Sequence, residues 1–304
     1  MLPIKKNNFF NAQFSFLIKL VTSFALCVLP ATVLADEFWA QGFVQAVDIS
    51  YGDDPLQTMD AFEHGARIGE PTYFAPDESP RPTLMWIHGG GWVAGDKASQ
   101  TSQLIPYLQR GWRVFNVNYR QGPDTAPNAV DDVMCAYKYI EQRLRKAGQP
   151  TDQIVVSGAS AGGHLALVVG LLNASGAHRC QADTPPRAVV NWFGITDIEM
   201  VDEYLQGRNP KRNYARSWAG SAAKIAAVSE AFSPLYLISD KAPPIISVHG
   251  TNDTVVPYDQ GEALHASLIT PNELVTLPGG NHSGFTNAQY IEAYSRIFKF
   301  LAAH

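Results

Sequence analysis

The sharpest chemical pattern in the chain is a serine between two glycines. Ser160 is the central residue of the run GASAG, which follows the apolar residues beginning at Ile154. A G-x-S-x-G run between a strand and a helix predicts a sharp turn that presents the serine hydroxyl at the edge of a sheet. Glycine and serine are common, so this run alone could be an ordinary turn. Residues elsewhere in the chain must show whether Ser160 is a reactive serine or part of an ordinary turn.

Two further runs supply a base and an acid for Ser160. Asp253 ends the run HGTND and His282 ends the run GGNH, and each run follows a predicted strand. A serine hydroxyl needs an imidazole to take its proton and a carboxylate to orient that imidazole. The order Ser160, Asp253, His282 is the order of this set in one class of α/β enzymes. Asp197 follows another predicted strand and is the alternative acid.

The run HGGGW, from His88 to Trp92, predicts donors for a developing oxyanion. Successive glycines let backbone amides approach a substrate closely. We expect the amides of Gly90, Gly91 and Ala161 to fill this role, and Trp92 to contact the substrate. The alternative is a phosphate-binding loop, but the glycine spacings typical of those loops are absent here.

The other histidines are predicted to be structural, and no metal or cofactor is expected. His88 precedes the glycines, His164 falls inside the predicted helix after Ser160, and His249 lies at a strand end. No His, Cys and Asp cluster has zinc-like spacing.

Alternating strands and helices must position these residues. Apolar strand-like runs are predicted at 43–49, 59–62, 84–87, 112–117, 154–156, 188–193, 245–248 and 274–277, and helices at 104–109, 129–147, 162–173, 258–268 and 288–303. Such alternation predicts an α/β fold with a mostly parallel sheet and helices on both faces. Residues 198–234 hold no strand and form a lid-like excursion, whose Trp218 we expect to contact the substrate.

The first 35 residues are typical of a secretory signal peptide. Lys5, Lys6 and Lys19 precede an uncharged run of 16 residues that ends at Ala35. That run is shorter than the roughly 20 residues of a spanning helix, so we expect cleavage after Ala35, export to the periplasm or medium, and no stable membrane insertion. An uncleaved anchor is the alternative. Residues 36–304 are then expected to form a single catalytic domain.

The charge of the chain limits its expected binding partners, and its cysteine content predicts a disulfide. The chain has 23 Lys and Arg against 28 Asp and Glu, and loss of the signal peptide lowers the net charge from −5 to −8. An acidic chain without a basic cluster does not favour nucleic acid. Cys135 and Cys180 remain, and in an exported protein we predict that they form a disulfide, the alternative being two buried thiols. The sequence leaves the oligomeric state open.

The runs HGGGW, GASAG, HGTNDTVVP and GGNHSGF together resemble the α/β-hydrolase superfamily. They are most similar to bacterial carboxylesterases and feruloyl-esterase-like enzymes, with hormone-sensitive-lipase and kynurenine-formamidase groups as relatives. The resemblance implies an α/β-hydrolase fold and cofactor-free ester hydrolysis, with Ser160 as nucleophile, His282 as base and Asp253 as orienting acid. It covers nearly all of the chain after Ala35.

The chain departs from one of the related groups, and two other functions are compatible with the same residues. Hormone-sensitive-lipase relatives carry an N-terminal helical cap, but only 52 residues separate Ala35 from His88. We therefore expect an open cleft, partly covered by residues 198–234, for bulky, aromatic or short-acyl esters. The same set of groups could cleave an amide, as in a serine peptidase or an arylformamidase. A non-catalytic binding protein with this fold is the other alternative.

Overall fold

The computed structural model describes residues 43–64, 80–176 and 178–304. The predicted signal peptide and its cleavage site after Ala35 lie outside the described residues. In the described part of the chain, no helix combines the length and the apolar character needed to cross a membrane.

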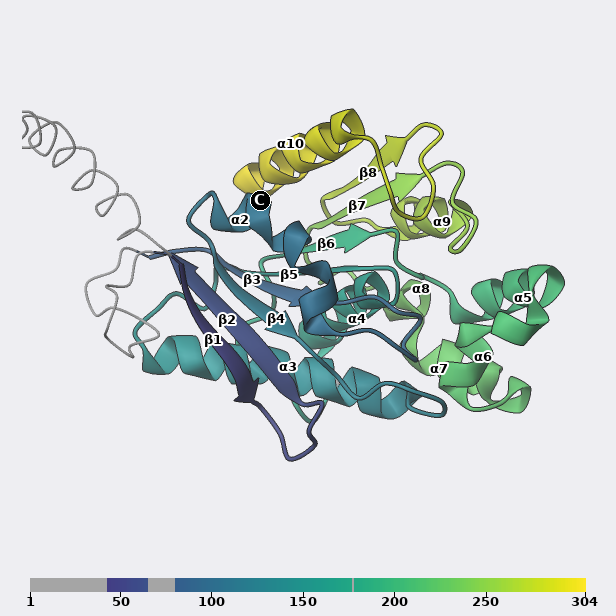
Figure 1. Cartoon of the computed structure of the whole chain (residues 1–304), viewed down its shortest axis with the longest axis horizontal. Coiled ribbons are helices and arrows are strands. Elements are labelled where there is room, and N and C mark those ends of the chain that lie inside the picture. The colour runs from purple at the N-terminus through teal and green to yellow at the C-terminus, as the bar shows by residue number, and fades with distance from the viewer. Residues whose placement is uncertain (1–42, 65–79, 177) are drawn as a thin grey trace, which may run out of the picture.

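One eight-stranded sheet, in the order β1-β2-β4-β3-β5-β6-β7-β8, forms the centre of the described structure (Figure 1). β1 pairs antiparallel with β2 and β2 antiparallel with β4, while every pair from β4 to β8 is parallel. The predicted mostly parallel sheet is therefore confirmed. The strands are β1 (Phe43–Ser50), β2 (Thr58–His64), β3 (Thr83–Ile87), β4 (Arg113–Val117), β5 (Ile154–Ala159), β6 (Ala188–Trp192), β7 (Ile245–Gly250) and β8 (Asn272–Leu277).

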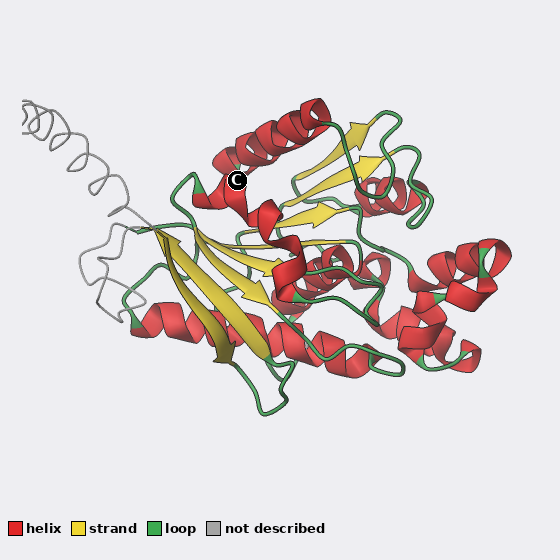
Figure 2. Cartoon of the chain, viewed as in Figure 1, coloured by secondary structure: helices red, strands yellow, loops and turns green. Residues whose placement is uncertain are grey.

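Helices cover both faces of this sheet, as Figure 2 shows. Alternate residues of one strand point to opposite faces, so Met85 and Ile87 join one apolar core while Leu84 and Trp86 join the other. A strand buried on both faces reads as a continuous apolar run, which is why β3 could be predicted from the sequence. The first core includes α3 (Ala126–Lys146), α4 (Ala161–Ser175) and α9 (Asp259–Ser267), and the second includes α2 (Ile105–Leu108) and α10 (Asn287–Ala303).

The largest differences from the predicted helix boundaries lie at the start of α3 and ahead of α2. α3 begins at Ala126, three residues earlier than expected, because a proline in the first turn is compatible with a helix. The helix predicted at 104–109 is preceded by a 3₁₀ segment, η1 (Lys97–Leu104), which begins where the Asp96 side chain accepts a hydrogen bond from the amide of Ala98. This polar segment has no apolar periodicity that would have revealed it.

The excursion between β6 and β7 holds no strand, as predicted, and the structure shows that it is helical. It contains α5 (Ile198–Arg208), η2 (Pro210–Arg212), α6 (Tyr214–Ala219), η3 (Ala222–Lys224), α7 (Ile225–Phe232) and α8 (Pro234–Leu237). Figure 1 shows α5, α6 and α7 on the side toward which the parallel strands point. Catalytic and binding groups of open α/β sheets lie at that edge.

Cys135 of α3 and Cys180, which follows α4, form a disulfide, so the predicted pairing is confirmed. The bond closes a loop over a sequence separation of 45 residues that includes β5 and α4. In the chain-entropy model such a loop stabilises the fold by about 4 kcal/mol.

Candidate active site

Ser160 lies in a tight turn between the end of β5 and the start of α4. Its backbone has φ 56° and ψ −123°, a conformation that costs energy for a residue with a side chain. The turn is held because the Ser160 amide donates to the carbonyl of Trp192 at 2.8 Å. A Cβ atom on Gly162 would lie 2.1 Å from the carbonyl oxygen of Ile87. Only glycine fits there, as the G-x-S-x-G pattern predicted.

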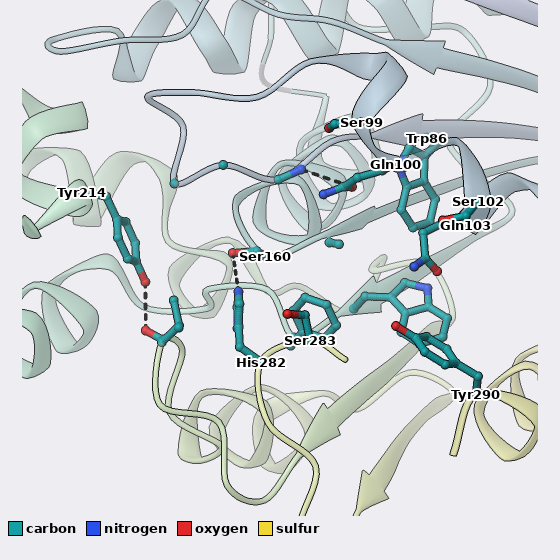
Figure 3. Close-up of a pocket in the computed structure, with 17 residues that line it drawn as sticks. Trp86, Ser99, Gln100, Ser102, Gln103, Ser160, Tyr214, His282, Ser283 and Tyr290 are labelled. Atoms are coloured by element: carbon teal, nitrogen blue, oxygen red, sulfur yellow. Dashed lines mark hydrogen bonds between the residues drawn. The ribbon is translucent and has the colours of Figure 1, made fainter. Parts of the chain in front are cut away.

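Ser160, His282 and Asp253 form a continuous hydrogen-bonded chain. His282 Nε2 lies 3.0 Å from Ser160 Oγ, and His282 Nδ1 lies 2.7 Å from Asp253 Oδ2 (Figure 3 draws the first bond). A carboxylate only accepts, so Nδ1 carries the proton and Nε2 is left to accept from the serine hydroxyl. The structure thus brings together three residues that the sequence places on three separate loops.

The carboxylate of Asp253 is buried and held in one orientation. Its Oδ1 accepts hydrogen bonds from the amides of Val255 at 2.8 Å and Val256 at 2.9 Å. His249 Nε2 donates to the carbonyl of Val256 and lies 3.4 Å from Asp253 Oδ2. Burial alone would raise the pKa of Asp253, but the hydrogen bonds from His249 and His282 outweigh it and hold the pKa well below its usual range. The carboxyl group is therefore ionised.

Asp197, the alternative acid, has another role in the structure. Its side chain accepts hydrogen bonds from the amides of Glu199 and Met200 and so caps the N-terminus of α5. A carboxylate at this position stabilises the helix. The described structure gives it no contact with His282.

The glycine loop after β3 places backbone amides beside Ser160. Gly90, Gly91 and Trp92 have φ values of 122°, 60° and 62°. In the described part of the chain, no group accepts a hydrogen bond from the amides of Gly90, Gly91 or Ala161. His88 braces this loop: its Nδ1 donates to the carbonyl of Gly89 at 2.7 Å, and its ring stacks on Tyr119. The amides are thus available to a substrate oxygen.

The prediction that Trp92 and Trp218 contact the substrate is wrong for this structure. Both indoles are fully buried, and they stack on each other with ring centroids 4.4 Å apart. A side chain without exposed surface has none to offer a ligand. Among the aromatic side chains of the described lining, Tyr214 and Tyr290 are half-buried and keep the most exposed surface. Residue type and loop position alone did not reveal that the indoles of Trp92 and Trp218 are buried.

A cleft of about 440 Å³ opens over Ser160, which is a usual size for a small-molecule site. In Figure 3 the labelled Tyr214 lies on one side of Ser160 and His282, and Trp86, Gln103 and Tyr290 lie on the other. His282 is the only ionisable His, Asp, Glu, Lys or Arg side chain of the lining. The lining residues are Trp86, Gly89, Gly90, Gly91, Ser99, Gln100, Ser102, Gln103, Ala159, Ser160, Trp192, Phe193, Tyr214, Val255, His282, Ser283 and Tyr290.

Sequence reasoning missed two contributors to this cleft. Phe193 packs edge-on against the His282 ring, with centroids 4.7 Å apart, and so limits how far the imidazole can tilt. Its place directly after β6, at the same sheet edge as Ser160, was the signal that could have found it. The amide side chains of Gln100 and Gln103 come from η1, a polar segment without the apolar periodicity that predicts a helix.

Within the described ranges, no group of three or more His, Cys, Asp or Glu side chains is arranged to hold a metal ion.

Known proteins resemble this chain in sequence and in fold. It is 29% identical to esterase LipC of Mycobacterium tuberculosis over 79% of its own length and 60% of that protein. It is 30% identical to the probable carboxylic ester hydrolase LipM of the same organism over 70% of its length and 49% of that protein. The chain thus matches about half to three-fifths of the length of these relatives.

Among solved structures, esterase B of Lactobacillus rhamnosis matches with a TM-score of 0.69 at 20% identity, covering 95% of this chain and 96% of that one. A truncated carbohydrate esterase from gut microbiota matches with a TM-score of 0.69 at 18% identity, over 85% and 96% of the two chains. These likenesses confirm the predicted α/β-hydrolase fold. The family model described as BD-FAE matches residues 73–268, well over half of the sequence, and the chain belongs to that family.

Proposed function

We propose that this protein is a carboxylic ester hydrolase that works through an acyl-enzyme on Ser160. The observation that carries the proposal is the hydrogen-bonded chain from Ser160 Oγ to His282 and on to Asp253, with bonds of 3.0 and 2.7 Å, at the floor of an open cleft. A binding protein of this fold has no need for that chain. The esterase names of the sequence relatives support the same reaction class.

The mechanism follows from the proton positions. Ser160 attacks the ester carbonyl while its proton passes to His282 Nε2, and Asp253 stabilises the imidazolium that forms. His282 then protonates the departing alkoxide, which leaves as the alcohol. A water molecule gives a proton to the same nitrogen and attacks the acyl-enzyme. The imidazolium then returns that proton to Ser160 Oγ as the bond to the acyl group breaks and the acid leaves.

The negative oxygen of each tetrahedral intermediate needs donors that are already in place. The amides of Gly90, Gly91 and Ala161 have no competing acceptor in the described structure. Ala161 is also the first residue of α4, so the positive end of the helix dipole faces the same point. We propose these three amides as the oxyanion hole.

The cleft favours uncharged substrates. Among the described residues that line it, the half-buried Tyr214 and Tyr290 offer flat apolar surface, and Gln100 and Gln103 offer neutral hydrogen-bonding groups. The same described lining holds no Lys, Arg, Asp or Glu side chain to balance a charged acid or amine. We propose esters with small or aromatic uncharged acyl groups, feruloyl-type esters included.

We also propose that the protein is exported after removal of residues 1–35. The disulfide between Cys135 and Cys180 supports this, because such bonds persist in oxidising compartments outside the cytoplasm. Mass measurement of the protein recovered from culture medium and periplasm tests both the location and the cleavage site.

Covalent labelling tests the proposed reaction. We expect a fluorophosphonate probe to form one adduct, located on Ser160 by mass spectrometry, and Ser160→Ala to lose the adduct together with about six orders of magnitude in kcat. Ser175→Ala is the matched control: that serine also belongs to α4, but its hydroxyl donates to the carbonyl of Leu172, away from the cleft. It should keep both labelling and turnover.

The substrate class is tested in parallel. Nitrophenyl esters of increasing acyl length, methyl ferulate and a peptide anilide should show ester cleavage exceeding amide cleavage. Turnover of the anilide above that of every ester would overturn the ester assignment in favour of a peptidase or amidase. Absence of any adduct on Ser160 would favour a binding protein.

A further inference from the structure

The excursion packs against the glycine loop through two aromatic side chains of α6. Trp218 of α6 stacks on Trp92 at 4.4 Å with an interplanar angle of 13°. Tyr214 of the same helix packs so closely that a Cβ atom on Gly91 would lie 2.9 Å from its own Cβ. The excursion therefore supports the loop whose amides we assign to the oxyanion hole.

A histidine inside α4 joins the same contacts by hydrogen bonds. The indole Nε1 of Trp92 donates to His164 Nδ1 at 3.1 Å, and His164 Nε2 donates to the carbonyl of Phe232, the last residue of α7, at 2.9 Å. The imidazole is fully buried and packs edge-on against the rings of Trp92 and Trp218. The imidazole thus links the glycine loop, α4 and the excursion.

The bond from Trp92 requires the neutral imidazole, with its proton on Nε2. A proton on Nδ1 would face the indole N–H with a second donor and break this bond. Burial lowers the pKa of His164 to about 3, so the ring keeps its acceptor at neutral pH. His164 does not line the cleft, and both of its nitrogens are occupied. It therefore has no proton-transfer role of its own.

We propose that His164 is a positioning residue for the oxyanion hole, which ties Trp92 to the carbonyl of Phe232 and so fixes the amides of Gly90 and Gly91. Trp92 holds a φ of 62° directly after these glycines, and a fixed indole keeps that conformation in place. The excursion thus supports the glycine loop through the Trp92–Trp218 stack and the carbonyl of Phe232. The catalytic part of this inference rests on the proposed ester hydrolysis.

A double-mutant cycle tests the link. His164→Phe removes both hydrogen bonds and keeps a ring, while Trp92→Phe removes the donor and keeps an aromatic ring against Trp218. Misplaced donors act mainly in the transition state, so each variant should lose about ten- to a hundredfold in kcat with KM within about threefold. The double variant should lose no more than the worse single variant, because both changes break one bond.

Two further variants separate positioning from general stability. His164→Asn keeps an acceptor near the position of Nδ1 and should recover part of the kcat lost in His164→Phe. Asn173→Ala is the matched control, a buried polar residue of α4 that bonds the carbonyl of Val169 and the amide of Ala182, far from the loop. It should lower the unfolding temperature and leave kcat unchanged.

An observation independent of activity completes the test. The chain has six tryptophans, and the indole N–H resonance of Trp92 can be assigned by its loss in Trp92→Phe. We expect His164→Phe to shift that resonance and speed its hydrogen exchange, and His164→Asn to do so less. Additive losses in the double variant, kcat within twofold of wild type in His164→Phe, or an unmoved resonance would overturn the proposal. If Ser160 takes no fluorophosphonate label, the proposed ester hydrolysis is wrong. The Trp92 indole resonance still tests whether His164 holds the glycine loop.

Discussion

Two side chains in the loops beside Ser160, the carboxylate of Asp253 and the indole of Trp92, are held in place in different ways. The Asp253 carboxylate is oriented by its own turn, since it accepts hydrogen bonds from amides two and three residues further along the chain. The glycine loop is fixed by distant residues: Trp92 bonds to His164, 72 positions away, and stacks on Trp218 of the excursion.

This difference decides what each loop tolerates. Local hydrogen bonds form as soon as a short segment adopts its turn, so the orientation of the Asp253 carboxylate is set within residues 253–256. Positive φ values in the glycine loop cost energy that only tertiary packing repays. We therefore expect changes at Asp253 to act on chemistry alone, and changes in the glycine loop to act on both chemistry and stability.

The largest effect should come from Asp253→Asn. The amide can no longer hold the Nδ1–H tautomer of His282, so kcat should fall by about 10⁴ while the fold stays intact. Asp197→Asn is the matched control, because that carboxylate caps α5 and leaves His282 untouched. Kinetics and thermal unfolding of both variants measure the contrast, and a loss below tenfold in Asp253→Asn would count against its assignment.

Gly91→Ala should be next, with a loss of about 10²–10³ in kcat. The added methyl group meets the Tyr214 side chain at 2.9 Å, and an alanine at a φ of 60° is strained, so the amide must move. Gly148→Ala is the control, with a φ of 67° but nothing within 4 Å of its Cβ. It should cost about 1 kcal/mol of stability from backbone strain and nothing in kcat. Equal kinetic losses in both variants would contradict the role of Tyr214.

The smallest effect concerns pH. The pKa of Asp253 is held below its usual range, so this carboxylate stays ionised as the pH falls and loses its proton acceptor role only in strong acid. The fall of kcat/KM in acid should then reflect protonation of a single group other than Asp253, with about a tenfold loss per pH unit. A slope of two, or a rate that stays flat down to about pH 4, would contradict the assignment.

The sequence predicted the parts of the site that depend on local chemistry. The G-x-S-x-G turn, the positions of Asp253 and His282 at strand ends, and the glycine run could be identified because each is a short motif whose residue types limit its backbone. Trp92 and Trp218 were misassigned because burial of an indole depends on which distant segment covers it. Phe193 was missed for the same reason.

The same division between locally determined features and features set by distant contacts applies to the fold. Strands buried on both faces were evident as apolar runs, whereas the polar segment η1, which lines the cleft, carries no such pattern. A segment of this kind is ordered by contacts rather than by its own periodicity. The backbone amide of Lys97, for example, donates to the side chain of Asn118 at 2.6 Å.

The bond between Cys135 and Cys180 encloses the reactive serine within a covalent ring of the chain. A protease that cuts once anywhere between these two positions leaves both pieces attached, so the nucleophile cannot drift away from its base and its donors. Hydrolysis could therefore outlast a first nick in surroundings rich in proteases. A thiol reductant would remove that tolerance without touching a single group of the reaction.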